Sequence, residues 1–128
     1  MLIEGHKDCP SEAVGFIYRI LYSDGKMYIG KKLIRAIRRV KPTKAMLAVR
    51  KNAVRKEWKN LPFVKYEGSS DFTKDKTIVR KEILMFCNTK KQTTYYETKE
   101  LFLRDCIIDD MYMNHTIQNR FFRRDFKE

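Results

Sequence analysis

Two stretches near the start of the chain combine aromatic and β-branched residues in the way that is typical of β-strands. Residues 15–22 have the sequence GFIYRILY, and residues 26–30 have the sequence KMYIG. Between them, Ser23, Asp24 and Gly25 form a turn signal. The pattern predicts an antiparallel β-hairpin with strands at 15–22 and 26–30.

The length of the hairpin turn decides which tyrosines share a face. A type I turn closed by a glycine in the left-handed conformation gives a three-residue loop, and Gly25 is placed to supply that glycine. We then expect Ile20 to face Tyr28, and Tyr18 to face Gly30. Because facing residues and every second residue project the same way, Tyr18 and Tyr28 would share one face. A two-residue loop would put them on opposite faces.

The later part of the chain predicts one more strand and several helices. Residues 31–40 have an apolar stripe and predict a short helix or an irregular basic arm, which Pro42 ends. Residues 44–60 predict a helix, and residues 77–87 predict a third strand. Residues 94–108 predict a helix whose main apolar face contains Tyr95, Phe102, Leu103, Cys106 and Ile107.

The ends of the chain and one internal segment carry weaker patterns. Residues 1–13 predict a loosely structured lead-in, and residues 68–70 (Gly-Ser-Ser) predict a turn or a helix cap. Residues 114–128 predict a helical or irregular tail. Together the elements predict one domain over residues 1–128, of the α+β class. In it a small antiparallel three-stranded sheet, formed by the hairpin and the later strand, is flanked by helices.

Positive charge is concentrated in one segment. The chain has 28 lysines and arginines against 16 acidic residues, a net charge of +12. From Lys31 to Lys59 there are twelve basic residues and a single acidic one, Glu57. A solvated helix face usually mixes both signs, and binding to an anionic membrane would also need a large aromatic face. Nucleic acid is therefore the partner that this basic arm or helix, residues 31–60, favours.

The composition excludes several other classes. No apolar stretch reaches the ~18 residues of a membrane span, and the N-terminal sequence lacks the pattern of a signal peptide. Three scattered cysteines indicate a reducing compartment rather than a disulfide framework. His6 and Cys9 have half of a zinc-site spacing, but no second pair follows. We expect a cytoplasmic protein that does not bind membranes.

The hairpin also carries a pair of motifs. Residues 16–18 (Phe-Ile-Tyr) followed by residues 28–30 (Tyr-Ile-Gly) resemble the paired signature of the GIY-YIG nuclease superfamily, and the string GKMYIGKK is especially similar to its short phage-encoded, homing-type members. The first motif departs from the signature by a phenylalanine in place of glycine. Later segments resemble the same proteins in the same order: residues 58–59, 66–70, 80–87, 96–97 and 112–114.

The resemblance implies metal-assisted hydrolysis of a DNA phosphodiester bond with Mg²⁺ or Mn²⁺. It implies that Tyr18 and Tyr28 are catalytic, with Tyr18 as the base or the water-positioning group, and that Glu97 is the metal ligand. A free tyrosine has a pKa near ~10, so its ionised form costs roughly 4 kcal/mol at pH 7 unless a cation such as Lys32 lies nearby. From the residues alone, the ordinary alternatives are two packed strand tyrosines and a surface glutamate. Helical projection puts Glu97 far from the main apolar face, on a stripe with Leu101, Arg104 and Ile108. This position fits an edge-of-core site and an ordinary surface acid equally well.

Family members also carry an arginine after the second motif, and this chain offers several. Arg38 has the usual spacing and is the preferred catalytic candidate, while Arg35 and Arg39 are near neighbours. Arg55 becomes the choice if residues 33–50 are an inserted arm. The arginine would clamp a phosphate oxygen through paired N–H donors, which lysine does less specifically.

We predict that six residues contact the backbone of double-stranded DNA: Lys31, Arg35, Arg39, Arg55, Lys59 and Asn114. Specificity for a long site would come from the basic arm, from a homodimer or from another protein. A phage-encoded member would act in the cytoplasm of the infected host. Two other functions stay open. One is a catalytically inactive nucleic-acid-binding module with the same fold, and the other is an RNA-binding accessory protein, although the chain lacks an RNA-recognition aromatic motif.

Overall fold

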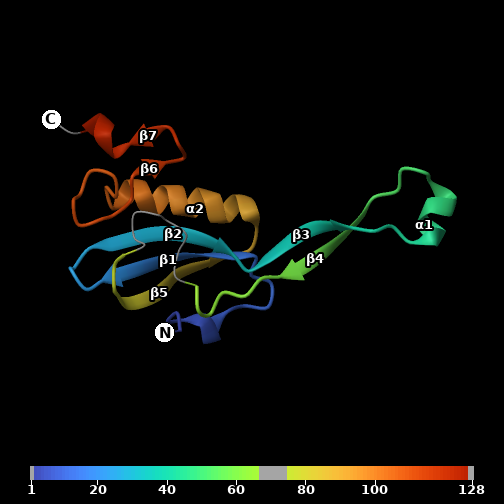
Figure 1. The fold of residues 1–128 in the computed structure, drawn as a ribbon, viewed down its shortest axis with the longest axis horizontal. Helices are drawn as coiled ribbons and strands as arrows, with labels where there is room; N and C mark the ends of the chain where they lie inside the picture. Colours follow the sequence, from blue (N-terminus) through green and yellow to red (C-terminus); the bar gives the residue numbers. More distant parts are fainter. Residues whose placement is uncertain (1, 67–74, 127–128) are drawn as a thin grey trace.

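The centre of the computed structural model, which describes residues 2–66 and 75–126, is a three-stranded antiparallel sheet with the order β2-β1-β5 (Figure 1). Its strands span Gly15–Tyr22 (β1), Met27–Leu33 (β2) and Ile78–Cys87 (β5). Helix α2 (Lys90–Leu103) lies against one face of this sheet. The α+β class, the hairpin and the third strand are therefore confirmed.

The hairpin has the register that a three-residue turn predicts. Tyr18 faces Gly30 and Ile20 faces Tyr28, so both tyrosines project from the same face of the sheet. Gly25 closes the turn with φ +85°, a left-handed conformation that side chains other than glycine rarely adopt. The prediction of the odd-numbered loop is confirmed.

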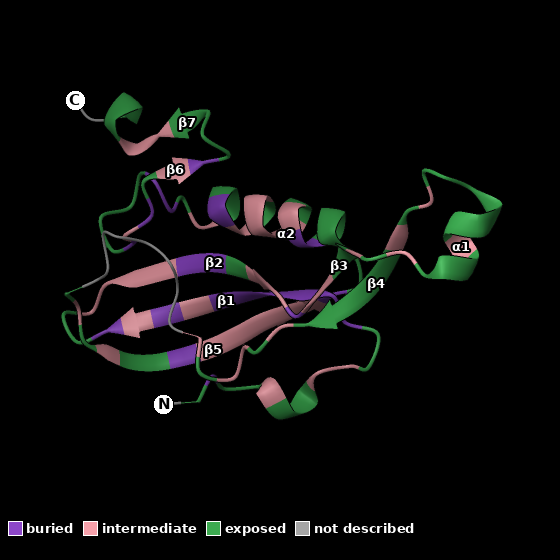
Figure 2. Cartoon of the chain, turned by 45° about the vertical axis from the view of Figure 1, so that its right-hand side comes forward, coloured by how far each residue is buried: buried purple, intermediate pink, exposed green. Residues whose placement is uncertain are grey.

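Side chains of β1 alternate between two hydrophobic clusters, one on each face of the sheet. Ile17 packs with Ile29 and Leu101 in the cluster beneath α2. Phe16 and Tyr18 lie in the cluster on the opposite face, which the N-terminal segment and the chain around Phe63 cover. Figure 2 shows the buried residues concentrated on the central strand. The N-terminal segment is packed rather than loose, because Ile3 is buried completely and its N–H donates to the carbonyl of Val64 at 2.7 Å.

Helix α2 was predicted with the wrong face toward the core. Tyr95, Phe102 and Leu103 are 63%, 49% and 69% exposed, whereas the buried residues of the helix are Thr93 and Leu101. These two positions are eight residues apart, so the row that faces the sheet passes through position 97. The helix also ends before Cys106 and Ile107, which are buried by the turn that follows it.

The basic segment is a two-stranded ribbon, not a helix. Strands β3 (Arg35–Val40) and β4 (Arg55–Asn60) pair antiparallel, and only Lys44–Val49 is helical (α1), with Thr43 as its N-cap. The prediction of a helix over 44–60 was wrong. Of the two alternatives for residues 31–40, the helix was also wrong, whereas the basic arm is present but is built from regular strands rather than an irregular backbone. Their apolar residues Ile37 and Trp58 are a cross-strand pair and not members of helical stripes.

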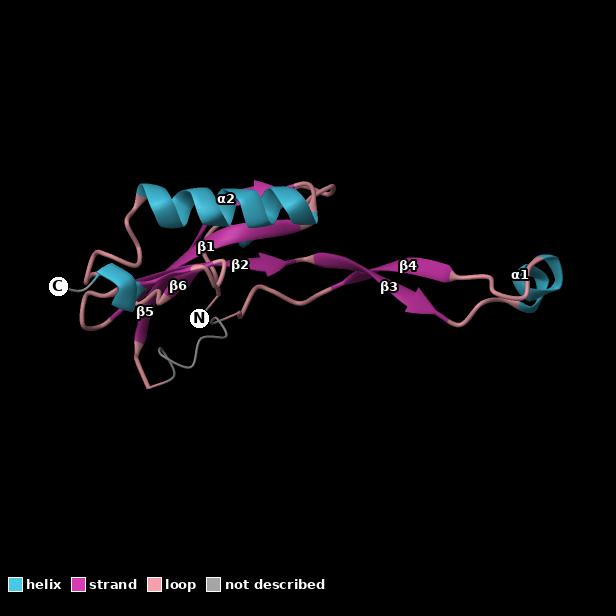
Figure 3. Cartoon of the chain, turned by 90° about the horizontal axis from the view of Figure 1, so that it is seen from above, coloured by secondary structure: helices cyan, strands magenta, loops and turns pink. Residues whose placement is uncertain are grey.

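The ribbon and helix α1 form an arm, residues 35–60, that extends away from the central sheet (Figures 1 and 3). The arm joins the sheet at two neighbouring points. The N–H of Ile34 donates to the carbonyl of Val14 at 2.7 Å, and the N–H of Leu61 donates to the carbonyl of Ile34 at 2.6 Å. Ile34 is also buried, so it anchors the arm to the core.

The C-terminal segment covers the free edge of β2. The N–H of Met27 donates to the carbonyl of Met111, and the N–H of Met113 donates to the carbonyl of Met27, both at 2.7 Å. Beyond this edge the chain forms two-residue strands, Thr116–Ile117 (β6) and Phe121–Phe122 (β7), and a 3-10 turn at Arg123–Phe126. The predicted tail is therefore irregular rather than α-helical in the residues described.

The predicted turn at residues 68–70 lies outside the described residues, and the division into one domain stays a prediction. Within residues 2–66 and 75–126, none of the helices has the length and apolar character needed to cross a lipid bilayer.

The side chain of Asn114 joins the C-terminal segment to β2. It is 5% exposed; its amide oxygen accepts from the N–H of Ile29 at 3.1 Å, and its amide nitrogen donates to the carbonyl of Ile29 at 2.8 Å. Replacing Asn114 by Ala would leave both backbone groups without these partners. We expect Asn114→Ala to lower the free energy of unfolding by about 2 to 4 kcal/mol, measured by urea denaturation. The exposed Asn52→Ala is the control and should change it by less than about 0.5 kcal/mol.

Gly30 is required by the ring of Tyr18, which lies over it. A Cβ added at Gly30 would sit 2.5 Å from Cζ and 3.0 Å from Cε1 of Tyr18. Because Tyr18 is 2% exposed and enclosed by other rings, it has little room to move aside.

We expect Gly30→Ala to destabilise the protein by about 1 to 3 kcal/mol through overpacking, measured by thermal or urea unfolding. In a Tyr18→Leu background the same substitution should cost clearly less, because the colliding ring is gone. An equal cost in both backgrounds would mean that the contact between the ring and Gly30 is not the cause.

Candidate active site

Tyr18 lies in the middle of the central strand β1, among other aromatic rings. Its ring centroid is 5.4 Å from that of Tyr66 and 6.3 Å from that of Tyr28. Burial raises the pKa of Tyr18 well above its usual value, and the neighbouring Tyr28, Tyr66 and Glu97 raise it further. Tyr18 therefore keeps its proton at neutral pH, and an even smaller fraction of it is ionised than of a free tyrosine.

Tyr28 and Glu97 line one open pocket of about 270 Å³ at the edge strand β2. Burial, and then the negative charge of Glu97, raise the pKa of Tyr28 to about 12. Ionising Tyr28 at pH 7 would cost roughly 7 kcal/mol, so its hydroxyl is a hydrogen-bond donor in this state. The remaining lining residues come from β2, α2 and the C-terminal segment: Ile29, Lys31, Leu101, Asn114, Thr116, Gln118 and Asn119.

Glu97 projects from the buried row of α2 that also contains Thr93 and Leu101. The sequence placed Glu97 on a stripe with Leu101 and left open an edge-of-core or a surface position. Because the aromatic side of the helix is exposed and Leu101 is buried, this stripe is the one that faces the sheet. Burial raises the pKa of Glu97, although the charge and the backbone N–H of Lys31 oppose this shift. A carboxylate with part of its hydration removed gains more than an exposed one from a nearby cation.

Two lysines of β2 flank these groups from opposite faces of the strand. Nζ of Lys31 donates to Oγ1 of Thr94 on α2 at 2.8 Å. Nζ of Lys32 lies 5.0 Å from the ring centroid of Tyr66, a cation–π arrangement beside the buried tyrosines. β2 itself therefore supplies positive charge beside Glu97 and Tyr66.

None of the candidate arginines lines the pocket with Tyr28 and Glu97. Arg35, Arg38 and Arg39 lie on β3, and Arg55 lies on β4 with Lys59, all within the arm. The catalytic role of Arg38 stays a prediction, as do the DNA contacts of the other basic residues. Asn114 does line the pocket, but its amide is hydrogen-bonded to the backbone of Ile29.

Three residues at the site were not singled out from the sequence. Tyr66 packs against Tyr18, and Gln118 and Asn119 line the pocket with φ of 54° and 53°. Tyr66 stands in the 66–70 segment that resembles the family, which was a usable signal. Nothing in the sequence marks Gln118 and Asn119, since their position depends on how the C-terminal segment folds over β2.

The donor set of the pocket fits a hard divalent cation with few protein ligands. Glu97 is the only acidic residue among the described lining residues, accompanied by amide side chains of Asn114, Gln118 and Asn119. In the part of the chain that the structure describes, no three His, Cys, Asp or Glu side chains gather as a closed metal site. Mg²⁺ commonly uses one or two carboxylates and takes its other ligands from water and substrate phosphate. The pocket therefore suits Mg²⁺ better than zinc.

The family comparison agrees with this geometry. Residues 3–117 match the family described as "Putative endonuclease segE, GIY-YIG domain". No curated protein and no solved structure gave a significant match to the chain. The matched range contains both motif tyrosines, Glu97 and the whole three-stranded sheet, which has the arrangement of that fold. The chain belongs to the GIY-YIG family of endonuclease domains.

Proposed function

We propose that this protein is a metal-dependent endonuclease that hydrolyses phosphodiester bonds of double-stranded DNA at the pocket of Tyr28 and Glu97. The observation that supports this most is the convergence of Tyr18, Tyr28 and Glu97 from three different elements around the edge of β2. Membership of an endonuclease family supports the reaction class. The DNA substrate is supported by the net charge of +12 and its concentration in the arm.

In this proposal Glu97 holds Mg²⁺ or Mn²⁺, and Tyr28 donates a hydrogen bond to the reacting phosphate or to the attacking water. The bound cation would supply charge for the developing negative oxygens and lower the pKa of a bound water. Tyr18 keeps Tyr28 and Tyr66 in place, and Lys32 adds positive charge beside them. The raised pKa values argue against a tyrosinate base in the metal-free protein.

The arm would hold the DNA, with Arg38, Arg39, Arg55 and Lys59 contacting phosphates from both ribbon strands. A phage-encoded, homing-type enzyme of this kind would act in the cytoplasm of the infected host, alone or as a homodimer. The family name, a segE endonuclease, supports this type.

A second candidate is a catalytically inactive DNA-binding module with the same fold. The observation that favours it is the lack of an arginine among the described residues that line the pocket. Family members carry an arginine after the second motif, so its displacement into the arm would remove a transition-state contact.

A nicking assay on supercoiled plasmid with Mg²⁺ separates the two candidates. We expect Glu97→Gln to cut at least about 10³-fold more slowly than the wild type, because a metal ligand supports several kcal/mol of charge stabilisation. Glu100→Gln is the matched control: it removes the same charge from the same helix, at a residue bonded to Arg104 outside the pocket. If the wild type binds the plasmid but does not cut it in the presence of Mg²⁺, the protein is the DNA-binding module and not an endonuclease.

The difference in stability between Glu97→Gln and the wild type should depend on pH. Burial raises the pKa of Glu97, so the folded protein binds this proton more tightly than the unfolded chain does. The ionised carboxylate therefore costs stability above its folded pKa, and the cost vanishes as the pH falls below the unfolded value near ~4.3. In metal-free buffer we expect the variant to melt at a higher temperature than the wild type near neutral pH. The difference should shrink toward pH ~4, and a pH-independent difference would contradict the assignment.

A further inference from the structure

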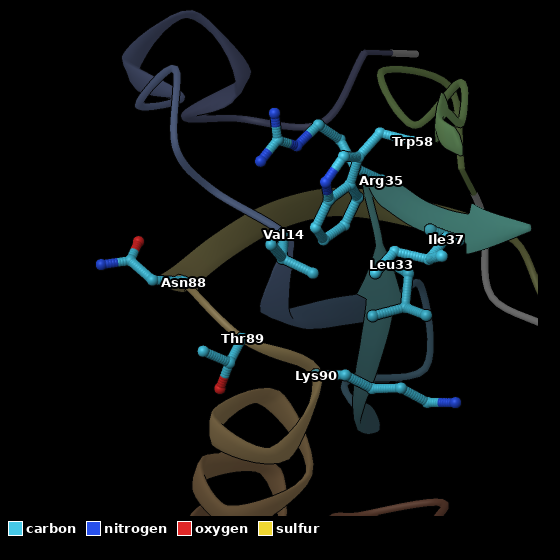
Figure 4. A pocket seen from close by; sticks show the side chains of 9 residues that line it. Val14, Leu33, Arg35, Ile37, Trp58, Asn88, Thr89 and Lys90 are labelled. Atoms are coloured by element: carbon cyan, nitrogen blue, oxygen red, sulfur yellow. The ribbon is translucent and has the colours of Figure 1, made fainter. Parts of the chain in front are cut away.

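A second pocket, of about 510 Å³, lies where the arm joins the domain. Figure 4 shows it between the base of the arm, with Trp58 and Ile37, and the start of α2, with Thr89 and Lys90. Its walls are mainly apolar, from Val14, Leu33, Ile37 and Trp58. Two cations, Arg35 and Lys90, stand at its rim, and none of its described lining residues is acidic.

The ribbon of the arm has two unlike faces. Arg35, Ile37 and Arg39 of β3 share one face with Trp58 and Lys56 of β4, since alternate residues project the same way. Ile37 and Trp58 on this face are 56% and 54% exposed. The opposite face has Glu57, which is paired with Arg55. Only the first face combines exposed apolar surface with unopposed positive charge.

Arg35 is positioned for a ligand rather than for a protein partner. Its guanidinium stacks on the Trp58 indole at 4.8 Å from the ring centroid. Its Nε is buried and has no hydrogen-bond partner among the described residues. Stacking fixes the plane of the guanidinium and leaves N–H donors available for two oxygens of an anion such as phosphate.

We propose that this second pocket binds one unpaired nucleotide of the DNA strand that the enzyme cuts, with the base stacked on Trp58 and its two flanking phosphates bound by Arg35 and Lys90, which lie on opposite sides of the pocket (Figure 4). The proposal rests on the proposed DNA substrate. An apolar pocket with a cationic rim complements a nucleotide, which is a planar apolar base joined to an anion. A paired base has both faces covered by its neighbours in the stack, so only an unstacked base can present a face to the indole. The start of α2 adds a favourable dipole for the phosphate.

The two pockets lie along the same strand and helix, which fixes their spacing. Lys31 lines the active-site pocket and Leu33 lines the second one, two residues further along β2. On α2, Glu97 and Lys90 mark the same two positions. These separations correspond to about 7 Å on the strand and about 10 Å on the helix. At ~3.4 Å per nucleotide, the unpaired nucleotide would lie two or three nucleotides from the phosphate that is cut.

The test uses Trp58, the single tryptophan of the chain, as the probe. The full-length protein is titrated in EDTA, so that no DNA is cut, with a paired duplex and with the same duplex carrying a one-nucleotide bulge. We expect tighter binding of the bulged duplex, by roughly 10-fold, and quenching of Trp58 fluorescence by that duplex alone. Equal affinity for the two duplexes without selective quenching would overturn the proposal. Quenching that follows protein concentration without DNA would also overturn it, by showing that a second copy fills the pocket.

Matched variants separate this pocket from general charge effects. Arg35→Gln and Arg38→Gln each remove one charge from β3, but only Arg35 lines the pocket and Arg38 lies on the opposite face. We expect Arg38→Gln to weaken binding to both duplexes equally, whereas Arg35→Gln and Trp58→Ser reduce the preference for the bulge toward unity. Trp58→Phe, which keeps an aromatic face, should retain most of the preference when binding is followed by anisotropy of labelled DNA. If the wild-type protein binds neither duplex, the DNA substrate is refuted, and with it the proposed function.

Discussion

The contact between the Tyr18 ring and the backbone of Gly30 is the constraint on which the candidate active site depends. It exists only if Tyr18 faces Gly30 across the hairpin, and that register requires the three-residue turn with Gly25 in the left-handed conformation. A shift by one residue would send Tyr28 to the other face of the sheet. The glycine of the second motif is therefore explained by the space that a buried phenol ring needs, and the position of Tyr28 follows from the same register.

The burial that fixes these groups also determines their charge. The pKa values of Tyr18, Tyr28 and Glu97 are all raised, and in each case burial is the largest cause. The charge of Glu97 also raises the pKa of both tyrosines. Such a cluster favours neutral forms until positive charge enters it. The electrostatics therefore agree with a site that is completed by a divalent cation and a phosphate, with Lys31 and Lys32 beside it.

The sequence predicted the parts of the fold in which local and tertiary preferences agree. The strands of the hairpin and β5 consist of strand-forming residues that also fill the core. Their sequence pattern therefore predicted both the strands and the register of the hairpin correctly. In the arm, Ile37 of β3 pairs with Trp58 of β4, which lies further along the chain. The spacing of apolar residues along each segment resembled the spacing in a helix, and the sequence pattern therefore predicted the wrong element. The orientation of α2 failed for a related reason: Tyr95, Phe102 and Leu103 are exposed, while the small polar Thr93 faces the sheet beside Gly15. The family motifs drew attention to Tyr18, Tyr28 and Glu97, whose catalytic roles stay predictions, but no local pattern could place an arginine.

The attachment of the arm explains how a long insertion can serve a precise site. Ile34 is buried and its backbone bonds to both Val14 and Leu61, so the two ends of the insertion meet at one point on the sheet. β3 begins at Arg35, two residues after the end of β2 at Leu33, and the arm thus continues the edge strand that carries Tyr28, Lys31 and Lys32. A connection this short leaves little freedom between the basic arm and the pocket of Glu97. In the proposed function, DNA bound by the arm would therefore be positioned relative to the candidate active site by the backbone of β2 itself.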